Sequence, residues 1–226
     1  MSSSTTETPR PRLAILISGQ GSNMVAVAKA CLNGQIPADI VSVISDNAAA
    51  GGLLRARELG LHAGLVDRRG FTRDGRPDRP AFETALRAAL DACAPDYVIL
   101  AGFMRVLSEA FVAHYAGRML NIHPSLLPRH RGLDTHARAL AAGDAAHGAS
   151  VHFVTAGLDA GPLIAQATVP VLPGDDVATL SGRVHAREHK LYPMVIEWLV
   201  RGRLRWNDGQ PLLDGVPLTV PVRLRE

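Results

Sequence analysis

The stretch LAILISGQGSN, Leu13–Asn23, runs from five apolar residues through a glycine-containing turn into the beginning of a helix. Leu13–Ile17 has the length and composition of a buried strand. Ser22–Leu32 carries apolar residues at helical spacing, and Asn33-Gly34 ends it. A strand that leads through a glycine turn into a helix is typical of the first unit of a parallel α/β sheet.

The same alternation continues outward from this stretch. Further strands are expected at Ile40–Ile44, Ala63–Val66, Tyr97–Ala101 and Met119–Ile122, and helices at Gly52–Leu59, Pro80–Ala92 and Ser108–Tyr115. Continuous apolar strands separated by helices predict a parallel sheet that is buried on both faces. This arrangement is a doubly wound, Rossmann-like α/β fold.

Beyond Ile122 the pattern changes. A short helix is expected at Thr135–Ala142, strands at Gly148–Thr155 and Leu163–Val171, and a long helix from about Asp176 to Val200. The alternating strands favour a mixed section at this end of the sheet. We therefore predict one α/β domain whose parallel sheet has a mixed C-terminal section.

Three segments are expected along the chain. Residues 1–11, rich in Ser, Thr and Pro, predict a disordered leader, and residues 12–206 the folded domain. Residues 207–226 form a tail with hairpin-like turns at Asn207-Asp208-Gly209 and Asp214-Gly215.

Composition excludes several classes of protein. The 226 residues are 47% hydrophobic and 20% charged, which is ordinary for a globular chain and unlike a coiled coil or collagen. The longest apolar runs are too short to cross a bilayer, and the N-terminal segment lacks the apolar core of a secretory signal. We therefore expect no membrane association and a cytoplasmic location, with Cys31 and Cys93 as reduced core residues.

The net charge of +3 comes from 22 arginines and only two lysines, Lys29 and Lys190, against 21 acidic residues. Aromatic residues make up 4% of the chain, which leaves little material for stacking on nucleic-acid bases. A small anionic substrate is therefore a better expectation than nucleic acid.

The turn Ser18-Gly19-Gln20-Gly21-Ser22-Asn23 predicts an anion site. Backbone N–H groups at a helix N-terminus bind anions, and glycine lets the ligand approach closely. The spacing departs from both the dinucleotide fingerprint and the P-loop, so it favours a single phosphate. The alternative is a tight turn in which Ser22 is an ordinary helix N-cap.

A second motif, Asn121-Ile122-His123-Pro124-Ser125-Leu126-Leu127-Pro128, follows the fifth expected strand. Ligands in open parallel sheets bind beyond the carboxyl ends of the strands. Asn121 and His123 are two residues apart and therefore point the same way on an extended segment. An amide donor beside an imidazole suits addition to a carbonyl, although an Asn that caps a turn and a His bonded to the backbone is an open alternative.

The third motif spans Gly148–Pro162 and carries Asp159 in a loop flanked by glycines. A carboxylate there could orient and charge-stabilise a histidine. The chain has no Gly-x-Ser-x-Gly nucleophile motif. The pair His185 and His189 is flanked by basic residues, which disfavours a cation, so no metal site is expected.

Four stretches together resemble the glycinamide ribonucleotide transformylases of the folate-dependent formyltransferase family: Ile17–Asn23, Ala101–Arg105, Asn121–Pro128 and His147–Pro162. The resemblance runs from about Arg12 to Trp206. It implies transfer of a formyl group from 10-formyltetrahydrofolate to the amine of glycinamide ribonucleotide in purine synthesis. The amine attacks directly, through a tetrahedral intermediate, and no metal is needed. It also implies folate and ribonucleotide as small-molecule partners of a monomer or homodimer.

The resemblance further implies roles for individual residues. The catalytic residues are Asn121, His123 and Asp159. The ribonucleotide lies on the glycine turn and on one stretch of the long helix: Gly21, Ser22, Asn23, His185, Ala186, Arg187 and Glu188. The folate lies on two loops and beside Asn121 and Asp159: Met104, Arg105, Val106, Leu107, Thr155, Ala156, Gly157 and Leu158. Arg79 holds the glutamate end of the folate.

Two alternatives stay open at this point. A relative with the same chemistry could act on another amine, such as a sugar nucleotide, or on water. A non-catalytic nucleotide-binding module would need only Ser18–Asn23. The segment Arg68–Arg79 holds five arginines and almost no apolar residue, so we expect it to be poorly ordered without ligand.

Overall fold

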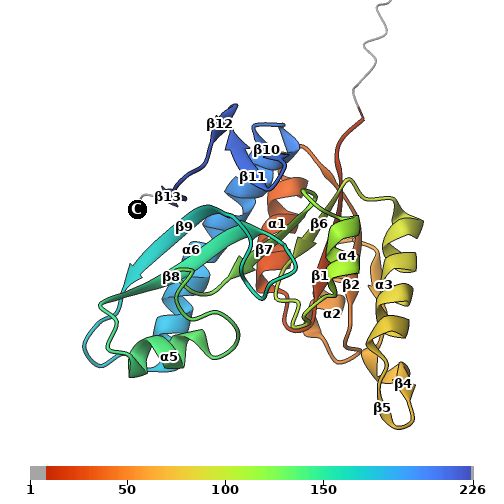
Figure 1. Ribbon diagram of the computed structural model, residues 1–226, viewed down its shortest axis with the longest axis horizontal. Helices are drawn as coiled ribbons and strands as arrows, with labels where there is room; N and C mark the ends of the chain where they lie inside the picture. Colours follow the sequence, from red (N-terminus) through yellow and green to blue (C-terminus); the bar gives the residue numbers. More distant parts are fainter. Residues whose placement is uncertain (1–8, 225–226) are drawn as a thin grey trace, which may run out of the picture.

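An eight-stranded sheet runs through the centre of the computed structural model, which describes residues 9–224 (Figure 1). The strand order is β13-β9-β8-β7-β6-β1-β2-β3. The parallel part consists of β1 (Arg12–Ile17), β2 (Asp39–Ser45), β3 (Ala63–Leu65), β6 (Tyr97–Leu100) and β7 (Met119–His123).

The sheet becomes mixed beyond β7. β8 (Ala146–Phe153) pairs antiparallel with both β7 and β9 (Leu163–Pro170), and β13 (Val222–Leu224) adds to β9 in parallel. The predicted α/β fold, parallel with a mixed C-terminal section, is confirmed. The sequence did not indicate the edge strand β13.

Helices cover both faces of the sheet because its central strands are apolar on both sides. In β1, Leu13, Ile15 and Ile17 belong to one buried cluster, while Ala14 and Leu16 belong to the other. The first cluster is completed by α1 (Ser22–Leu32), α2 (Gly51–Glu58) and α6 (Val177–Val200). The second is completed by α3 (Arg79–Cys93) and α4 (Glu109–His114). A short helix, α5 (Thr135–Ala141), connects β7 to β8.

The segment that was expected to be poorly ordered has regular structure. It contains a 3-10 turn (Arg68–Gly70) and a hairpin of β4 (Thr72–Arg73) and β5 (Arg76–Pro77). The expectation overlooked Phe71, whose ring packs edge-on against Phe82 of α3 at 5.9 Å between centroids.

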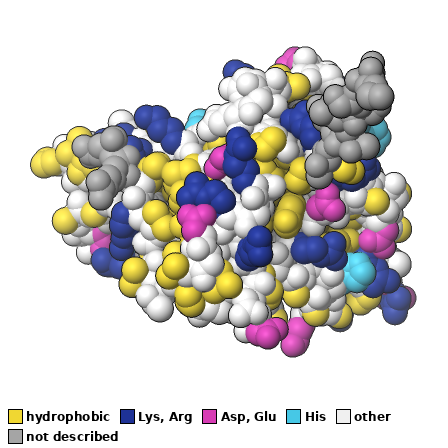
Figure 2. All heavy atoms as spheres, turned by 90° about the horizontal axis from the view of Figure 1, so that it is seen from above, with side chains coloured by type: hydrophobic (Ala, Val, Ile, Leu, Met, Phe, Trp, Pro, Cys, Tyr) yellow, Lys and Arg dark blue, Asp and Glu magenta, His cyan; other side chains and the backbone are white. Residues whose placement is uncertain are grey.

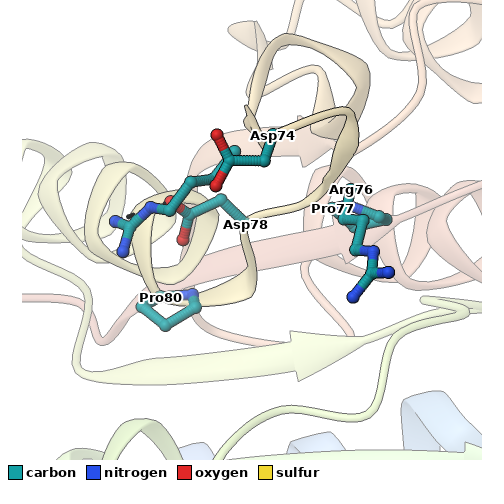
Figure 3. Close-up of a pocket in the computed structure, with 6 residues that line it drawn as sticks. Asp74, Arg76, Pro77, Asp78 and Pro80 are labelled. Carbon is teal, nitrogen blue, oxygen red and sulfur yellow. Dashed lines mark ion pairs between the residues drawn. The ribbon is translucent and has the colours of Figure 1, made fainter.

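A shallow hollow of about 420 Å³ lies beside this hairpin (Figure 3). Arg73 forms an ion pair of 2.8 Å with Asp78, which also caps α3 by accepting a hydrogen bond from the Ala81 N–H. Figure 3 shows Arg76 pointing away from the carboxylates of Asp74 and Asp78. The hairpin is therefore tied to the beginning of α3 by charge pairing as well as by Phe71.

The C-terminal segment forms a small antiparallel sheet of β10 (Leu204–Asn207), β11 (Gln210–Leu213) and β12 (Val216–Pro217). Its strands are joined at the two predicted turns, with Asn207 paired to Gln210 and Leu213 to Val216. The boundary placed after Trp206 falls inside β10, and the Trp206 ring packs on Phe153 at 4.9 Å.

Most of the predicted leader lies outside the described residues. Its last part does contact the domain, because Arg10 donates a hydrogen bond to the Ala38 carbonyl and pairs with Asp39 at 3.2 Å. In the described part of the chain, no helix is long and apolar enough to cross a membrane. Figure 2 shows basic side chains scattered among acidic and apolar ones on one face.

Candidate active site

The glycine turn between β1 and α1 has the geometry of an anion site. Gly21 is the N-cap of α1 with φ 70° and ψ 31°, and no side chain in the described structure caps this helix. The alternative of a Ser22 N-cap is therefore wrong. The backbone N–H groups of the first turn are left available for a ligand.

Close packing requires glycine at this turn. A Cβ on Gly21 would lie 3.0 Å from the Gly52 Cα, and positive φ is unfavourable for other residues. The Gly52 N–H in turn donates to the Gly19 carbonyl at 3.0 Å. The start of α2 thus holds the turn in place.

The long helix brings one carboxylate to this turn. The Asn23 amide donates to Glu188 Oε2 at 2.9 Å, and both side chains are buried. Burial raises the pKa of Glu188. His185 Nε2 lies 4.0 Å from the same carboxylate. The structure therefore brings Asn23, His185 and Glu188 together.

The other two residues predicted on this helix face elsewhere. Arg187 donates a hydrogen bond to the Leu224 carbonyl of β13 at 3.1 Å, and Ala186 is exposed. Residues three and four apart share a helix face, whereas intervening residues do not. The contact of Arg187 with β13 could not be foreseen because that strand was not predicted.

His123 lies buried at the end of β7, between two acceptors. Its Nδ1 is 3.3 Å from Asp159 Oδ2, and its Nε2 is 2.9 Å from the His130 carbonyl oxygen. A protonated imidazolium would satisfy both acceptors, since a carboxylate and a carbonyl can only accept. Asp159 also accepts from the Gly132 N–H at 2.9 Å, so its carboxylate is held in position.

The amide of Asn121 is oriented by His152, a residue that the sequence analysis did not select. Asn121 Nδ2 lies 3.2 Å from His152 Nε2, and His152 Nδ1 lies 2.9 Å from the Phe153 carbonyl. Burial lowers the pKa of His152, which favours the neutral ring. Its Nδ1–H then donates to Phe153, and its Nε2 accepts one N–H of Asn121.

A second carboxylate supports His123 indirectly. Asp144 Oδ2 lies 2.7 Å from His130 Nε2, and hydrogen bonding from His130 holds the pKa of Asp144 below its ordinary value. The backbone carbonyl of the same His130 accepts from His123. Asp144 thus fixes the loop that provides one of the two acceptors for the His123 imidazole.

The histidines near this loop do not make a metal site. His136 Nδ1 lies 3.1 Å from His147 Nε2, and burial lowers the pKa of His147 to about 4. Among residues 9–224, the structure contains no group of three or more His, Cys, Asp or Glu side chains placed to hold a metal ion.

The predicted folate segment 104–107 lies next to the glycine turn. The Met104 N–H donates to Ser18 Oγ at 2.8 Å, which joins the two loops. Met104 and Val106 are exposed, whereas Leu107 is buried. In the other predicted folate loop, Thr155–Asp159, Leu158 is exposed and lies near Gly132. Both predicted folate segments therefore carry exposed apolar side chains.

Asp46, which follows β2, holds the arginine of this segment. Its carboxylate is fully buried, and Oδ2 lies 2.9 Å from Arg105 Nε and 3.3 Å from Arg68 NH1. Its other oxygen is buried without a hydrogen-bond partner among the described residues. Asp46 could not be selected from the sequence because its two partners lie far away along the chain.

Arg79 reaches the same segment through Glu83. Arg79 Nε donates to Glu83 Oε1 at 2.8 Å, and the Ser108 N–H donates to the same oxygen at 2.7 Å. Burial alone would raise the pKa of Glu83, but the hydrogen bonds from Ser108 and Arg79 outweigh it and lower that pKa. Arg79 is thus anchored beside residues 104–107, with about half of its side chain exposed.

Comparisons with known proteins give matches in sequence and in structure. A model of the formyl transferase family matches residues 11–196. The chain is 48% identical to the phosphoribosylglycinamide formyltransferase of Escherichia coli K12, over 90% of this chain and 93% of that protein. It is 42% identical to the enzyme of the same name from Haemophilus influenzae, over 92% and 95% of the two chains. The solved structure of phosphoribosylglycinamide formyltransferase from Coxiella burnetii superimposes with a TM-score of 0.89 at 46% identity, covering 96% of this chain and all of that one.

Proposed function

The chain belongs to the formyl transferase family, and we propose that it transfers a formyl group from 10-formyltetrahydrofolate to the amine of glycinamide ribonucleotide. One observation carries the proposal beyond family membership. Asn121 and His123 share β7 beside Asp159, the charge of His123 acts on Glu188 at the uncapped glycine turn, and Ser18 of that turn accepts from Met104 of a segment with exposed apolar side chains. These features fit a formyl carbonyl, a phosphate and a pteridine respectively.

In the proposed reaction the ribonucleotide amine attacks the formyl carbon directly. One amide N–H of Asn121 donates to His152 Nε2, and the other donates to the developing oxyanion. The His123 N–H that donates to His130 is the one that can share its proton with the oxyanion, because the other ring nitrogen faces Asp159. Asp159 stabilises the imidazolium and helps relay a proton to the departing folate nitrogen.

The phosphate of the ribonucleotide is proposed to bind the N–H groups of Gly21, Ser22 and Asn23. Glu188, which accepts a hydrogen bond from the Asn23 amide, is proposed to bind the sugar. His185, whose Nε2 lies 4.0 Å from Glu188 Oε2, is proposed to lie at the edge of the ribonucleotide site. The folate is proposed to lie between residues 104–107 and Thr155–Asp159.

The decisive assay offers the protein 10-formyltetrahydrofolate with one amine at a time. Glycinamide ribonucleotide, an amino sugar nucleotide and water alone are the three conditions, and release of tetrahydrofolate is followed by absorbance. We expect rapid release with glycinamide ribonucleotide only. Comparable release with the sugar nucleotide, or without any amine, would refute the proposed substrate.

We expect Arg79→Ala to raise the folate KM several-fold and to leave the ribonucleotide KM unchanged. Arg79 donates to Glu83 through Nε, so the N–H groups of its two terminal nitrogens are available for a carboxylate of the folate glutamate. Steady-state kinetics at low and high salt check this, because the folate KM of the variant should depend less on salt. Arg87→Ala on α3 is the control. Unchanged folate KM and salt dependence in Arg79→Ala would remove Arg79 from the folate site.

We expect Asp46→Asn to raise the folate KM several-fold while kcat changes little. The substitution leaves Arg105 without its buried counter-charge and so loosens the segment 104–107. The free energy of unfolding should fall by about 1–3 kcal/mol, the usual cost of an unsatisfied buried group. Asp39→Asn, at the exposed beginning of β2, is the matched control. If stability falls but the folate KM does not move, then Asp46 is structural only.

The proposal also includes a cytoplasmic location and either a monomer or a homodimer. The unpaired Cys31 and Cys93 support a reducing compartment. Cell fractionation and analytical ultracentrifugation check the two statements separately.

A further inference from the structure

A second hollow, of about 610 Å³, lies between α1, α2 and α6 and is called here the α1–α6 groove. Its walls carry Lys29 from α1, Arg55 from α2 and Lys190 from α6. The groove does not include the proposed catalytic residues Asn121, His123 and Asp159, which lie on β7 and in the loop after β8. None of its described lining residues is acidic.

The three cations of the groove are free to bind a ligand. The side chains of Lys29, Arg55 and Lys190 make no ion pair or hydrogen bond with any residue in the described range. Elsewhere, arginines such as Arg105 and Arg183 are paired with carboxylates. Three like charges along one groove give it a positive potential, which attracts an anion.

Both lysines of the chain lie in this groove, although they are far apart in a sequence that otherwise uses arginine. The lysine ammonium is a compact point charge that suits phosphate oxygens. Ser22, the first residue of α1, also lines the groove, so the positive end of that helix dipole is close. These features favour a ligand that carries more than one phosphate.

The remaining surface of the groove is partly apolar. Val25, Ala26 and Pro193 line it together with the amide side chain of Asn33. Its volume lies in the range of sites for small molecules. A ligand with a flat organic body and a charged end therefore fits better than an inorganic ion alone.

We propose that the α1–α6 groove binds a nucleoside diphosphate. Its phosphates lie among Lys29, Arg55 and Lys190, and its base lies against Val25, Ala26 and Pro193. The groove shares Ser22 with the proposed ribonucleotide site but contains none of the proposed catalytic residues, and the inference does not depend on the identity of the formyl acceptor.

Calorimetric titration with ADP tests the site. ADP is expected to bind the unmodified protein, and pyrophosphate and adenosine are each expected to bind more weakly because each lacks half of the ligand. The double variant Lys29→Gln/Lys190→Gln should weaken ADP binding at least tenfold. Arg57→Gln/Arg87→Gln removes two exposed charges outside the groove and should change ADP binding less than twofold.

Four results would overturn the proposal. The first is the absence of ADP binding, and the second is an affinity for pyrophosphate equal to that for ADP. The other two are an unchanged ADP affinity in the lysine variant and an equal loss of ADP affinity in the arginine control. Gly21→Val is a further variant for the titration. If this variant loses ADP binding while the lysine variant keeps it, ADP binds at the glycine turn and not in the groove. Melting temperatures establish that each variant is folded, and the single lysine variants replace the double one if it is not.

Discussion

Replacement of His123 by alanine is expected to lower kcat by about 10²-fold or more, the usual effect of losing a group that moves protons in the transition state. The ribonucleotide Kd should change little, because the phosphate turn is built from other residues. The physical reason is the buried position of His123 between Asp159 and the His130 carbonyl, where water cannot replace the imidazole as a donor. Single-turnover kinetics and ribonucleotide titration measure the two quantities separately.

Two further variants make this prediction specific. Asp159→Asn keeps the shape of the side chain and tolerates its backbone φ of 46°, but removes the charge that faces His123. It should also reduce kcat strongly. His114→Ala, on the exposed end of α4, is the control and should leave kcat unchanged. If His123→Ala keeps near-normal turnover, the imidazole does not take part in the mechanism.

The second large effect is expected from Gly21→Val, which should weaken ribonucleotide binding by about 10-fold to 100-fold. This range corresponds to the loss of one hydrogen bond from an N–H group to a charged ligand, about 1.5–3 kcal/mol. The new Cβ would press against the Gly52 Cα at 3.0 Å and would strain a turn with φ 70°. Folate binding should be retained, because residues 104–107 and 155–159 belong to other loops. Equilibrium titration with each ligand gives both affinities.

The matched control for this variant is Gly34→Val, after the other end of α1. Gly34 has φ 80°, and an added Cβ there meets no atom within 4 Å. The two variants therefore share the backbone strain but differ in their distance from the turn. Equal loss of both ligands in Gly21→Val, or weakened ribonucleotide binding in Gly34→Val, would mean damage to the fold and not to a phosphate site.

The parallel core could be predicted from the sequence because its signals are local. Ser22–Leu32 is a helix with the predicted bounds, since Gly21 and Asn33-Gly34 bracket its apolar spacing. Leu13–Ile17 is apolar at every position because both faces of β1 are covered. β13 was missed because its three residues become a strand only by adding to β9, which is a tertiary contact.

For the site residues too, the ones that could be predicted are those whose signal is local in the sequence. Asn121 and His123 could be selected because alternation on a strand places them on one side. His152 could not, because it reaches Asn121 only through the antiparallel register of β7 and β8. Asp46 and the α1–α6 groove depend likewise on helices and loops that meet in space. The sequence pattern does not show which distant segments pair with one another.

The most direct test of the account is the product ratio in one reaction that contains glycinamide ribonucleotide and 10-formyltetrahydrofolate. The formylated ribonucleotide and tetrahydrofolate would be quantified together by chromatography. We expect one formylated ribonucleotide for each tetrahydrofolate released, and almost no release from Asn121→Ala or His123→Ala. Tetrahydrofolate released together with free formate, and without formylated ribonucleotide, would contradict it.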